Sequence, residues 1–278
     1  MSKTLSLGYS PCPTDTFIFY ALVHERITVP GIRFEERLED VETLNRLALD
    51  GALDLTKISY HALGRLRQEY ALLRSGGALG RGCGPLVVTR TPTSMGELRG
   101  KRIAIPGRLT TANLLLQLYG EGFENVLILP FDRIMEAVTT GEADAGVIIH
   151  ESRFTYKTLG LFQAEDLGAW WERESGCPIP LGGILARRSL GSELIGAIDT
   201  ALRESVAYAY AHPDEGRDYI KAHSQELADE VIDSHIGLYV NPFSLDLGDE
   251  GVQAVETLFA RAEARGIIPP CDLPLFAA

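Results

Sequence analysis

His150 is the residue of this sequence best placed to carry acid–base chemistry. It follows the apolar run Ala-Gly-Val-Ile-Ile (145–149), which is typical of a buried strand, and it precedes Glu-Ser-Arg. In open α/β folds, ligands bind at the carboxyl ends of the strands, where a residue in this position lies. An imidazole there, with an ordinary pKa of about 6.5, can accept or donate a proton at neutral pH. The alternative is a structural histidine that caps the strand by hydrogen bonds.

The other five histidines are weaker candidates for chemistry: His24, His61, His212, His223 and His235. His212, for example, fits the end of a helix, where the helix dipole favours a cation. No two histidines lie three to five residues apart beside a cysteine or carboxylate in ligand spacing, so a metal site has little support from the sequence.

Lys57, Ile58 and Ser59 end a second apolar run, Leu-Asp-Leu-Thr-Lys-Ile-Ser (53–59). A lysine inside such a strand is costly to bury, so its ammonium must reach solvent, a carboxylate partner or an anionic ligand. Ser59 could contact a ligand or cap the helix that follows. We therefore expect these three residues at a ligand site, with an outward-facing lysine as the alternative.

Thr110 and Thr111 precede Ala-Asn-Leu-Leu-Leu-Gln-Leu-Tyr, a helical pattern. Hydroxyls and unpaired amides at a helix N-terminus suit a carboxylate or phosphate, although simple capping would explain the same residues. Thr14-Asp15-Thr16 occupies a similar position after Ser-Pro-Cys-Pro. Because Asp15 would repel an anion, we expect hydroxyl recognition or capping there.

Composition narrows the function classes. The chain has 278 residues, of which 45% are hydrophobic and 23% charged, and a formal net charge of −12. These proportions are typical of a globular protein, while the acidic balance disfavours binding to nucleic acid or an anionic membrane. No apolar run is long enough to span a membrane and the N-terminal residues lack a secretory pattern, so we expect no membrane insertion and a cytoplasmic location.

Cofactor motifs are also missing from the sequence. The four cysteines, Cys12, Cys83, Cys177 and Cys271, form no Cys-x-x-Cys pair, which predicts free thiols. No glycine-rich phosphate-binding motif follows a strand and opens a helix. We expect neither a metal nor an organic cofactor, and any anionic small-molecule substrate has to be held by local groups.

Short apolar runs alternate with helical patterns up to about residue 190, after which the chain is predicted to be helical. This alternation predicts an α/β protein. Residues 51–58 (GALDLTKI) and 141–148 (GEADAGVI) share Gly-x-x-Asp-x-x-x-Ile at a shift of 90 residues. A looser match joins LSLGYSPCPTDTF to KRIAIPGRLTTAN. The repeat predicts two lobes of similar construction.

Two glycine-led strands, 84–90 and 182–189, bracket the second predicted lobe and suit a hinge. The predicted division is lobe one from 1 to 90 and 188 to 278, and lobe two from 91 to 187. A ligand would lie in the cleft between them.

Seven motifs in the same order resemble the 1,4-dihydroxy-6-naphthoate synthases of the futalosine route to menaquinone: SPCPTDTFIF, VETLN, TKISY, SGGALGRG-GPL, PG-TTAN, IIHESRFTY and DLGAWWE. The resemblance covers nearly the whole chain. It implies a two-lobed fold similar to type II periplasmic binding proteins, with a central ligand cleft.

The resemblance further implies a carbon–carbon lyase without metal or organic cofactor, which converts cyclic dehypoxanthine futalosine to 1,4-dihydroxy-6-naphthoate. It places the catalytic base at His150 and substrate contacts at Lys57, Ile58, Ser59, Thr110 and Thr111. One departure is that the family's first motif usually reads Asn-Asp-Thr, whereas this chain has Thr14. A threonine reproduces only part of the hydrogen bonding of an amide.

Two other functions fit the same fold. A solute-binding protein would need no catalytic residue, and a related dehydratase of the same pathway would act on chorismate. The missing secretory pattern argues against the first. Substrate tests are needed to separate the second.

Overall fold

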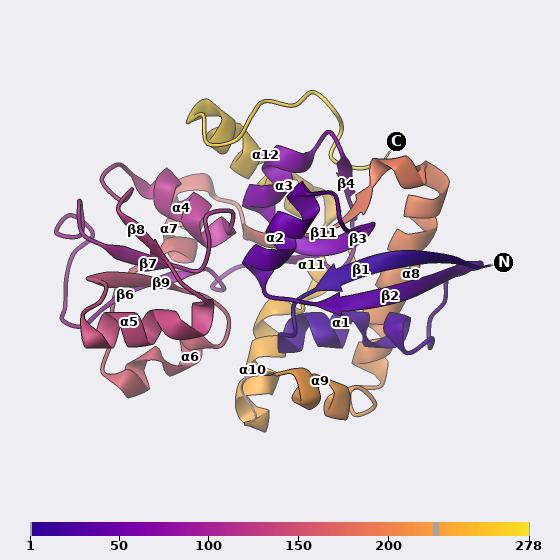
Figure 1. Cartoon of the computed structure of the whole chain (residues 1–278), viewed down its shortest axis with the longest axis horizontal. Helices are drawn as coiled ribbons and strands as arrows, with labels where there is room; N and C mark the ends of the chain where they lie inside the picture. Colours follow the sequence, from indigo (N-terminus) through magenta and orange to yellow (C-terminus); the bar gives the residue numbers. More distant parts are fainter. Residues whose placement is uncertain (1, 225–227, 278) are drawn as a thin grey trace.

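Two β-sheets divide the molecule, and helices cover both faces of each (Figure 1). The computed structural model describes residues 2–224 and 228–277. The strands of the first sheet are β1 (Lys3–Tyr9), β2 (Ile32–Leu38), β3 (Leu55–Ser59), β4 (Tyr70–Leu72), β5 (Ala78–Gly80) and β11 (Ile179–Arg187). Those of the second are β6 (Leu86–Thr89), β7 (Ile103–Ile105), β8 (Val126–Ile128), β9 (Ala145–Ile148) and β10 (Phe162–Asp166).

The predicted repeat is confirmed by the order of the strands. The first sheet runs β2-β1-β3-β11 and the second runs β8-β7-β9-β6. In both, the first two pairings are parallel and the third is antiparallel. Gly51 and Gly141, which open the two repeats, have φ angles of 63° and 85°. Glycine adopts this left-handed conformation without strain, so it ends the preceding helix in each lobe.

Helices enclose the two sheets (Figure 1), and among them α1 is buried along nearly its whole length. The first lobe contains α1 (Pro13–Val23), α2 (Val41–Leu49), α3 (Tyr60–Leu66), α8 (Ser192–Ala211), α9 (Arg217–His223), α10 (Asp229–Tyr239), α11 (Pro242–Leu245) and α12 (Gly248–Ala264). The second contains α4 (Thr111–Tyr119), α5 (Ile134–Thr140), α6 (Ser152–Thr155) and α7 (Leu167–Ser175). Short 3₁₀ turns lie at Phe131–Arg133, Tyr156–Leu159 and Arg188–Leu190. The predicted helical C-terminal part is confirmed, and α8 ends just before Pro213.

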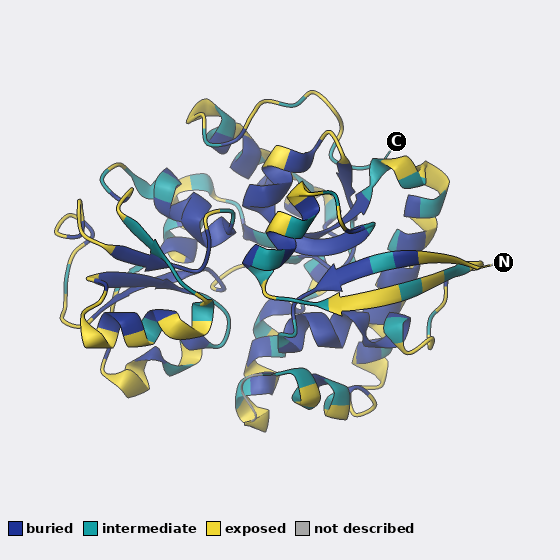
Figure 2. Ribbon diagram, in the orientation of Figure 1, coloured by how far each residue is buried: buried dark blue, intermediate teal, exposed yellow. Residues whose placement is uncertain are grey.

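The hydrophobic core follows these layers. In Figure 2 the strands are mostly buried, and the exposed residues lie on the outer faces of the helices and along β2. One buried cluster continues from Tyr60 and Phe259 of the first lobe to Leu115 and Trp171 of the second. The lobes therefore share apolar packing on one side. None of the described helices is long and apolar enough to cross a membrane.

The chain passes between the sheets twice. The two strands predicted to form a hinge each pair within one sheet, β6 with β9 and β10, and β11 with β3, β4 and β5. One connection is the loop of residues 81–85, just before β6, and the other leads from α7 of the second lobe through residues 176–178 to β11. The residue boundaries proposed for the two lobes stay a prediction.

The first connection crosses the start of α7 at a pair of glycines. A Cβ atom on Gly84 would lie 2.3 Å from the Cα of Gly168. The amide of Leu167 donates to the carbonyl of Pro85 at 3.0 Å. Arg153 ties the same crossing together, because its guanidinium donates to the Gly84 carbonyl at 2.5 Å and pairs with Asp166 at 2.7 Å. A side chain at Gly84 or Gly168 would collide with the backbone of the other glycine, so only glycine fits at these two positions.

Gly84→Ala should lower the free energy of unfolding by about 1–3 kcal/mol, because the new methyl group meets backbone that cannot rotate away. Denaturant unfolding measures this loss. Gly196→Ala is the matched control, since Gly196 is exposed on α8 with no atom within 4 Å of an added Cβ. We expect this control to gain up to about 1 kcal/mol from helix propensity. Equal effects of both changes would contradict the tight crossing.

Candidate active site

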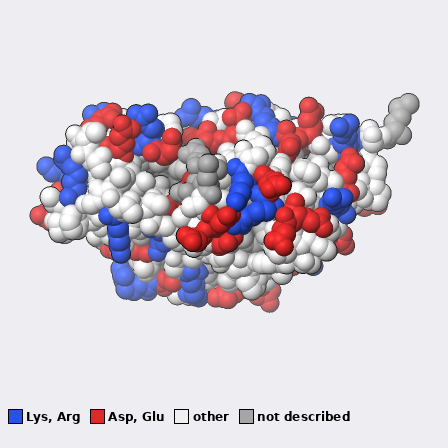
Figure 3. Space-filling view, turned by 90° about the horizontal axis from the view of Figure 1, so that it is seen from below, with Lys and Arg blue, Asp and Glu red and all other residues white. Residues whose placement is uncertain are grey.

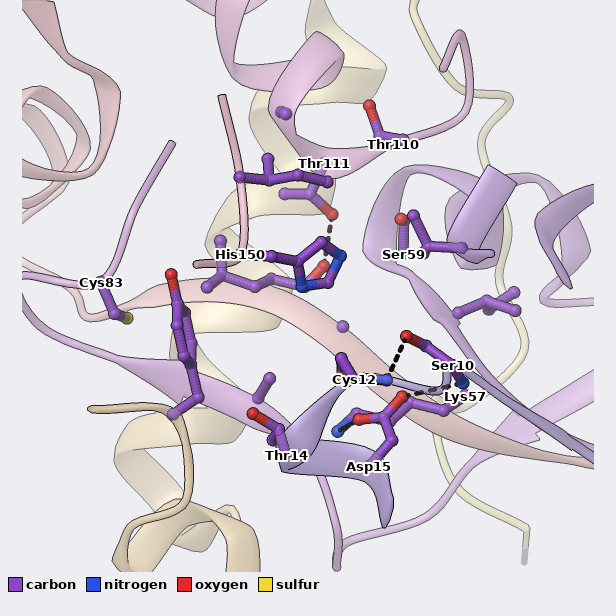
Figure 4. Close-up of a pocket in the computed structure, with 18 of the residues that line it drawn as sticks. Ser10, Cys12, Thr14, Asp15, Lys57, Ser59, Cys83, Thr110, Thr111 and His150 are labelled. Atoms are coloured by element: carbon purple, nitrogen blue, oxygen red, sulfur yellow. Dashed lines mark hydrogen bonds and ion pairs between the residues drawn. The ribbon is translucent and has the colours of Figure 1, made fainter. Parts of the chain in front are cut away.

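A cavity of about 110 Å³ lies between the lobes, at the carboxyl ends of β1, β3, β7 and β9 (Figure 4). All six residues singled out from the sequence line it: Lys57, Ile58, Ser59, Thr110, Thr111 and His150. The internal repeat explains this convergence, since each lobe contributes the same two loops. Their roles in binding and catalysis stay predictions.

His150 enters the cavity from the loop after β9, with a φ angle of 54°. A left-handed conformation is uncommon for a residue with a side chain, and such strain is concentrated at functional sites. The ring is half-buried and packs edge-on against Phe131, with 4.9 Å between ring centroids. Burial lowers the pKa of His150, while the carboxylates of Glu151 and Asp15 oppose that shift. The imidazole is therefore neutral at neutral pH and free to accept a proton.

Lys57 is paired inside the protein. Its ammonium lies 2.5 Å from a carboxylate oxygen of Asp15, and both side chains are buried. The other Asp15 oxygen accepts the Ser10 amide at 3.1 Å. The sequence left solvent, a carboxylate or an anionic ligand as partners of the Lys57 ammonium. In the structure the partner is the carboxylate of Asp15. The pair also compensates the negative charge expected of Asp15 at this helix start (Figure 4).

The two threonines of the α4 start are engaged within the protein. The Thr110 hydroxyl caps the helix, since it accepts the Asn113 amide at 3.2 Å and donates to the Gly107 carbonyl at 2.8 Å. The Thr111 hydroxyl donates to the Leu181 carbonyl at 2.6 Å and accepts the Tyr60 amide at 3.0 Å. The first amides of a helix lack acceptors within the helix, and no residue in the described part of the chain accepts those of Thr111 and Ala112, which line the cavity.

Ser59 precedes α3 at the capping position, but its side chain makes no capping bond. Instead its amide donates to the side-chain oxygen of Asn45 at 3.0 Å, and its hydroxyl accepts the Asn45 amide group at 3.4 Å. The capping alternative proposed for its hydroxyl is therefore wrong. The side chain remains on the cavity wall.

The sequence marks His235 as one of the weaker candidates for chemistry, yet the structure places it in the cavity. It lies on α10 and is only 1% exposed, with its ring centroid 6.1 Å from that of His150. Burial, followed by the electrostatic influence of His150 and of the Lys57 ammonium, lowers the pKa of His235 to about 3. The contact joins the two lobes and cannot be seen in local spacing. One available signal was the inward stripe Ile232, His235, Tyr239 along the helix.

One group of side chains could bridge a metal ion. His150, Glu151 and His235 each offer a ligand atom, and these atoms lie within 4.8 Å of one another. Two imidazoles and a carboxylate form a set that Zn²⁺ binds. Ligand spacing along the sequence does not reveal this group, because His235 belongs to the other lobe from His150 and Glu151. The same ring nitrogens and carboxylate oxygen could instead accept or donate protons in acid–base chemistry.

Hydrogen bonds across the cleft hold the lobes together beside the cavity. The carboxylate of Glu42, on α2, accepts the amides of Arg108 and Leu109 at 3.0 and 3.1 Å. His61 lies 3.3 Å from the Thr110 carbonyl through Nδ1 and is buried. These bonds, with that between Tyr60 and Thr111, describe a closed cleft.

Comparisons with known proteins agree with this site. The family model described as menaquinone biosynthesis matches residues 5–264. A 1,4-dihydroxy-6-naphthoate synthase of Thermus thermophilus is 60% identical over 274 residues, which cover 99% of each chain. The chain belongs to this menaquinone biosynthesis family. The resemblance found in its motifs is thereby confirmed, as is an enzymatic role in menaquinone biosynthesis.

Solved structures confirm the fold expected for this family member. A protein of Archaeoglobus fulgidus is 40% identical, with a TM-score of 0.89 over 95% of this chain and 98% of that one. A Candida albicans protein described as having the generic periplasmic-binding-protein fold is 16% identical, with a TM-score of 0.68 over 97% and 92%. At that identity the likeness shows the fold alone. The two-lobed periplasmic-binding-protein-like architecture is confirmed.

Acid should destabilise the closed form of this family member through His61. Burial and the nearby Arg65 lower the pKa of His61 to about 4, below the ordinary value of about 6.5 that applies when the chain unfolds. The contribution of neutral His61 to the free energy of unfolding is therefore complete above pH 6.5 and is lost as the pH falls toward 4. Between these two pH values the free energy of unfolding falls by about 1.4 kcal/mol per pH unit.

His61→Gln removes this titration and keeps an amide donor for the Thr110 carbonyl. Between pH 7 and pH 5, the loss in free energy of unfolding should be smaller than in the wild type by about 2 kcal/mol, measured in urea. His212→Gln, at an exposed histidine, is the control. An unchanged pH dependence in His61→Gln would contradict a buried neutral His61.

Chelation tests the expected absence of a metal cofactor. EDTA should leave turnover unchanged, because His150 needs a free nitrogen lone pair to accept a proton. Added Zn²⁺ should inhibit by occupying the same lone pairs. The rate of product formation and the metal content of the purified protein are the measurements. Loss of activity with EDTA and recovery with Zn²⁺ would show that the expectation is wrong.

Proposed function

We propose that this protein is a carbon–carbon lyase that converts cyclic dehypoxanthine futalosine to 1,4-dihydroxy-6-naphthoate, with His150 as the general base. The observation that carries the proposal is the imidazole of His150, which burial keeps neutral at a strained strand end inside the cavity. Its support from relatives is the 60% identity to a synthase of that name. The motif IIHESRFTY supports the assignment of the base.

Binding is assigned to the loops that face His150. The free amides of Thr111 and Ala112 suit a carboxylate of the substrate. Lys57 adds positive charge on the opposite wall, although its pairing with Asp15 leaves only part of that charge for a ligand. Closure of the lobes excludes water and fixes the reacting groups.

The chemical step follows from a base beside a substrate hydroxyl. His150 removes the hydroxyl proton, the oxygen forms a carbonyl double bond, and the adjacent carbon–carbon bond breaks. The electron pair of that bond moves into the ring system, which becomes aromatic as a small sugar-derived fragment leaves. The protonated His150 can return its proton to the product. No external oxidant or reductant enters this balance.

His150→Asn tests the assignment of the base. Turnover of cyclic dehypoxanthine futalosine should fall about 10²–10⁴-fold, because asparagine cannot accept the proton. The substrate dissociation constant, measured by calorimetry, should change only a few-fold. His212→Asn serves as a surface control that should retain wild-type turnover. Near-normal turnover of His150→Asn would remove His150 from the mechanism.

Parallel incubations separate the proposal from the other two functions that fit the fold. The wild type is incubated with cyclic dehypoxanthine futalosine and, separately, with chorismate, while the absorbance of naphthoate is followed. Product from the first alone supports the proposal. Consumption of chorismate alone would indicate a dehydratase, and binding of a ligand without turnover would indicate a solute-binding protein.

A further inference from the structure

His235 has a ring nitrogen in the cavity that the protein leaves unused. Its Nε2 atom is buried, and no residue that the structure describes forms a hydrogen bond with it. A buried polar atom without a partner costs about 1–3 kcal/mol. A ligand group that pairs with this atom removes that penalty when it binds.

Thr14 lies beside the other ring nitrogen of His235. The Thr14 hydroxyl lies 3.4 Å from Nδ1, and no other described residue forms a hydrogen bond with that hydroxyl. Nδ1 is therefore the acceptor available to the Thr14 hydroxyl hydrogen. A hydroxyl that donates to Nδ1 leaves the hydrogen of a neutral imidazole on Nε2. The unused nitrogen is then a hydrogen-bond donor.

An unused acceptor lies near this donor. The Oε2 atom of Glu151 is also buried and lacks a partner among the described residues. One ligand atom each from His150, Glu151 and His235 lie within 4.8 Å of one another. A charged pair, Lys57 and Asp15, lines the same cavity. The charge of Lys57 acts on both histidines and that of Asp15 acts on His150.

We propose that His150, Glu151 and His235 form a subsite for one hydroxyl group of the substrate, in which the Nε2 hydrogen of His235 binds the hydroxyl oxygen. A hydroxyl both donates and accepts, so it satisfies the donor of His235 and an acceptor on Glu151 or His150. This inference rests on the proposed function and names the hydroxyl that reacts. Thr14 is a positioning residue that acts through His235.

The subsite gives His235 a defined part in bond cleavage. When His150 takes the hydroxyl proton, the oxygen becomes an alkoxide, and the Nε2 hydrogen of His235 stabilises its negative charge. The alkoxide then forms the carbonyl as the carbon–carbon bond breaks, and its electron pair enters the ring system. His235 donates a hydrogen bond throughout and neither gains nor loses a proton.

Two substitutions at His235 separate the donor from the volume of the ring. His235→Phe keeps a ring and removes the donor, so turnover should fall about 10²–10³-fold while substrate affinity changes less. His235→Gln keeps an N–H donor and should retain at least about ten times the turnover of the phenylalanine variant. Circular dichroism and thermal unfolding check that both variants fold. Wild-type turnover in a folded His235→Phe would overturn the proposal, as would equal losses in both folded variants.

The tautomer of His235 provides a test that needs no substrate. Nitrogen-15 NMR of the histidine-labelled full chain, with the signal assigned by its loss in His235→Gln, should show the hydrogen on Nε2. Thr14→Val should shift the population toward the Nδ1 tautomer and lower turnover several-fold, whereas Thr14→Ser should restore both. A hydrogen on Nδ1 in the wild type would overturn the proposal.

The outcomes distinguish the subsite from the proposed function. If the wild type forms naphthoate but His235→Phe is fully active, the subsite fails and the lyase proposal stands. If the wild type forms no naphthoate, the lyase proposal fails, and the tautomer still decides the orientation of His235.

Discussion

The ion pair between Lys57 and Asp15 is the interaction on which the arrangement of the site depends. Both side chains are buried, and a buried charge without its partner would destabilise the fold by several kcal/mol. The pair joins β3 to the first turn of α1, so it fixes the loops after β1 and β3 relative to each other. The pair also acts on the nearby histidines: Lys57 adds to burial in lowering the pKa of His235, while at His150 the larger effect of the pair is that of Asp15, which opposes the lowering by burial. One contact thus bears on both the shape of the cavity and the electrostatics of its histidines.

The sequence was sufficient to predict the features that local pattern controls. Alternating strands and helices predict the α/β class, and the glycine that ends α2 and α5 marks the repeat. His150 could be identified because its position depends on the strand directly before it. For the same reason, the position of Thr110 at a helix start could be predicted from its neighbours.

Contacts between residues far apart in the sequence could not be predicted in this way. His235 lies on a helix 85 residues after His150, and only the folded chain brings the two rings together. The partner of Lys57 is a carboxylate 42 residues earlier, which the sequence presented only as a group that would repel anions. Glu42 accepts two amides 66 and 67 residues later in the chain, and no local signal marks that contact. Such pairings depend on how separate βαβ units pack, and no local periodicity encodes that.

The surface adds little to the argument for function, since acidic and basic side chains lie side by side over the face in Figure 3. The ion pairs of Arg217 with Asp229 and Asp233 are of this exposed kind. Exposed pairs of this kind contribute about 1 kcal/mol or less. The structural support for the proposed function therefore comes from the cavity.

The carboxylate of Glu42 has a consequence for the catalytic cycle. It accepts hydrogen bonds from two main-chain amides of the opposite lobe at the cavity edge. The lobes can separate at this edge only when both bonds break, so the two bonds add to the free energy that opening of the cleft requires. In a catalytic cycle that includes such an opening, its rate sets an upper limit on turnover.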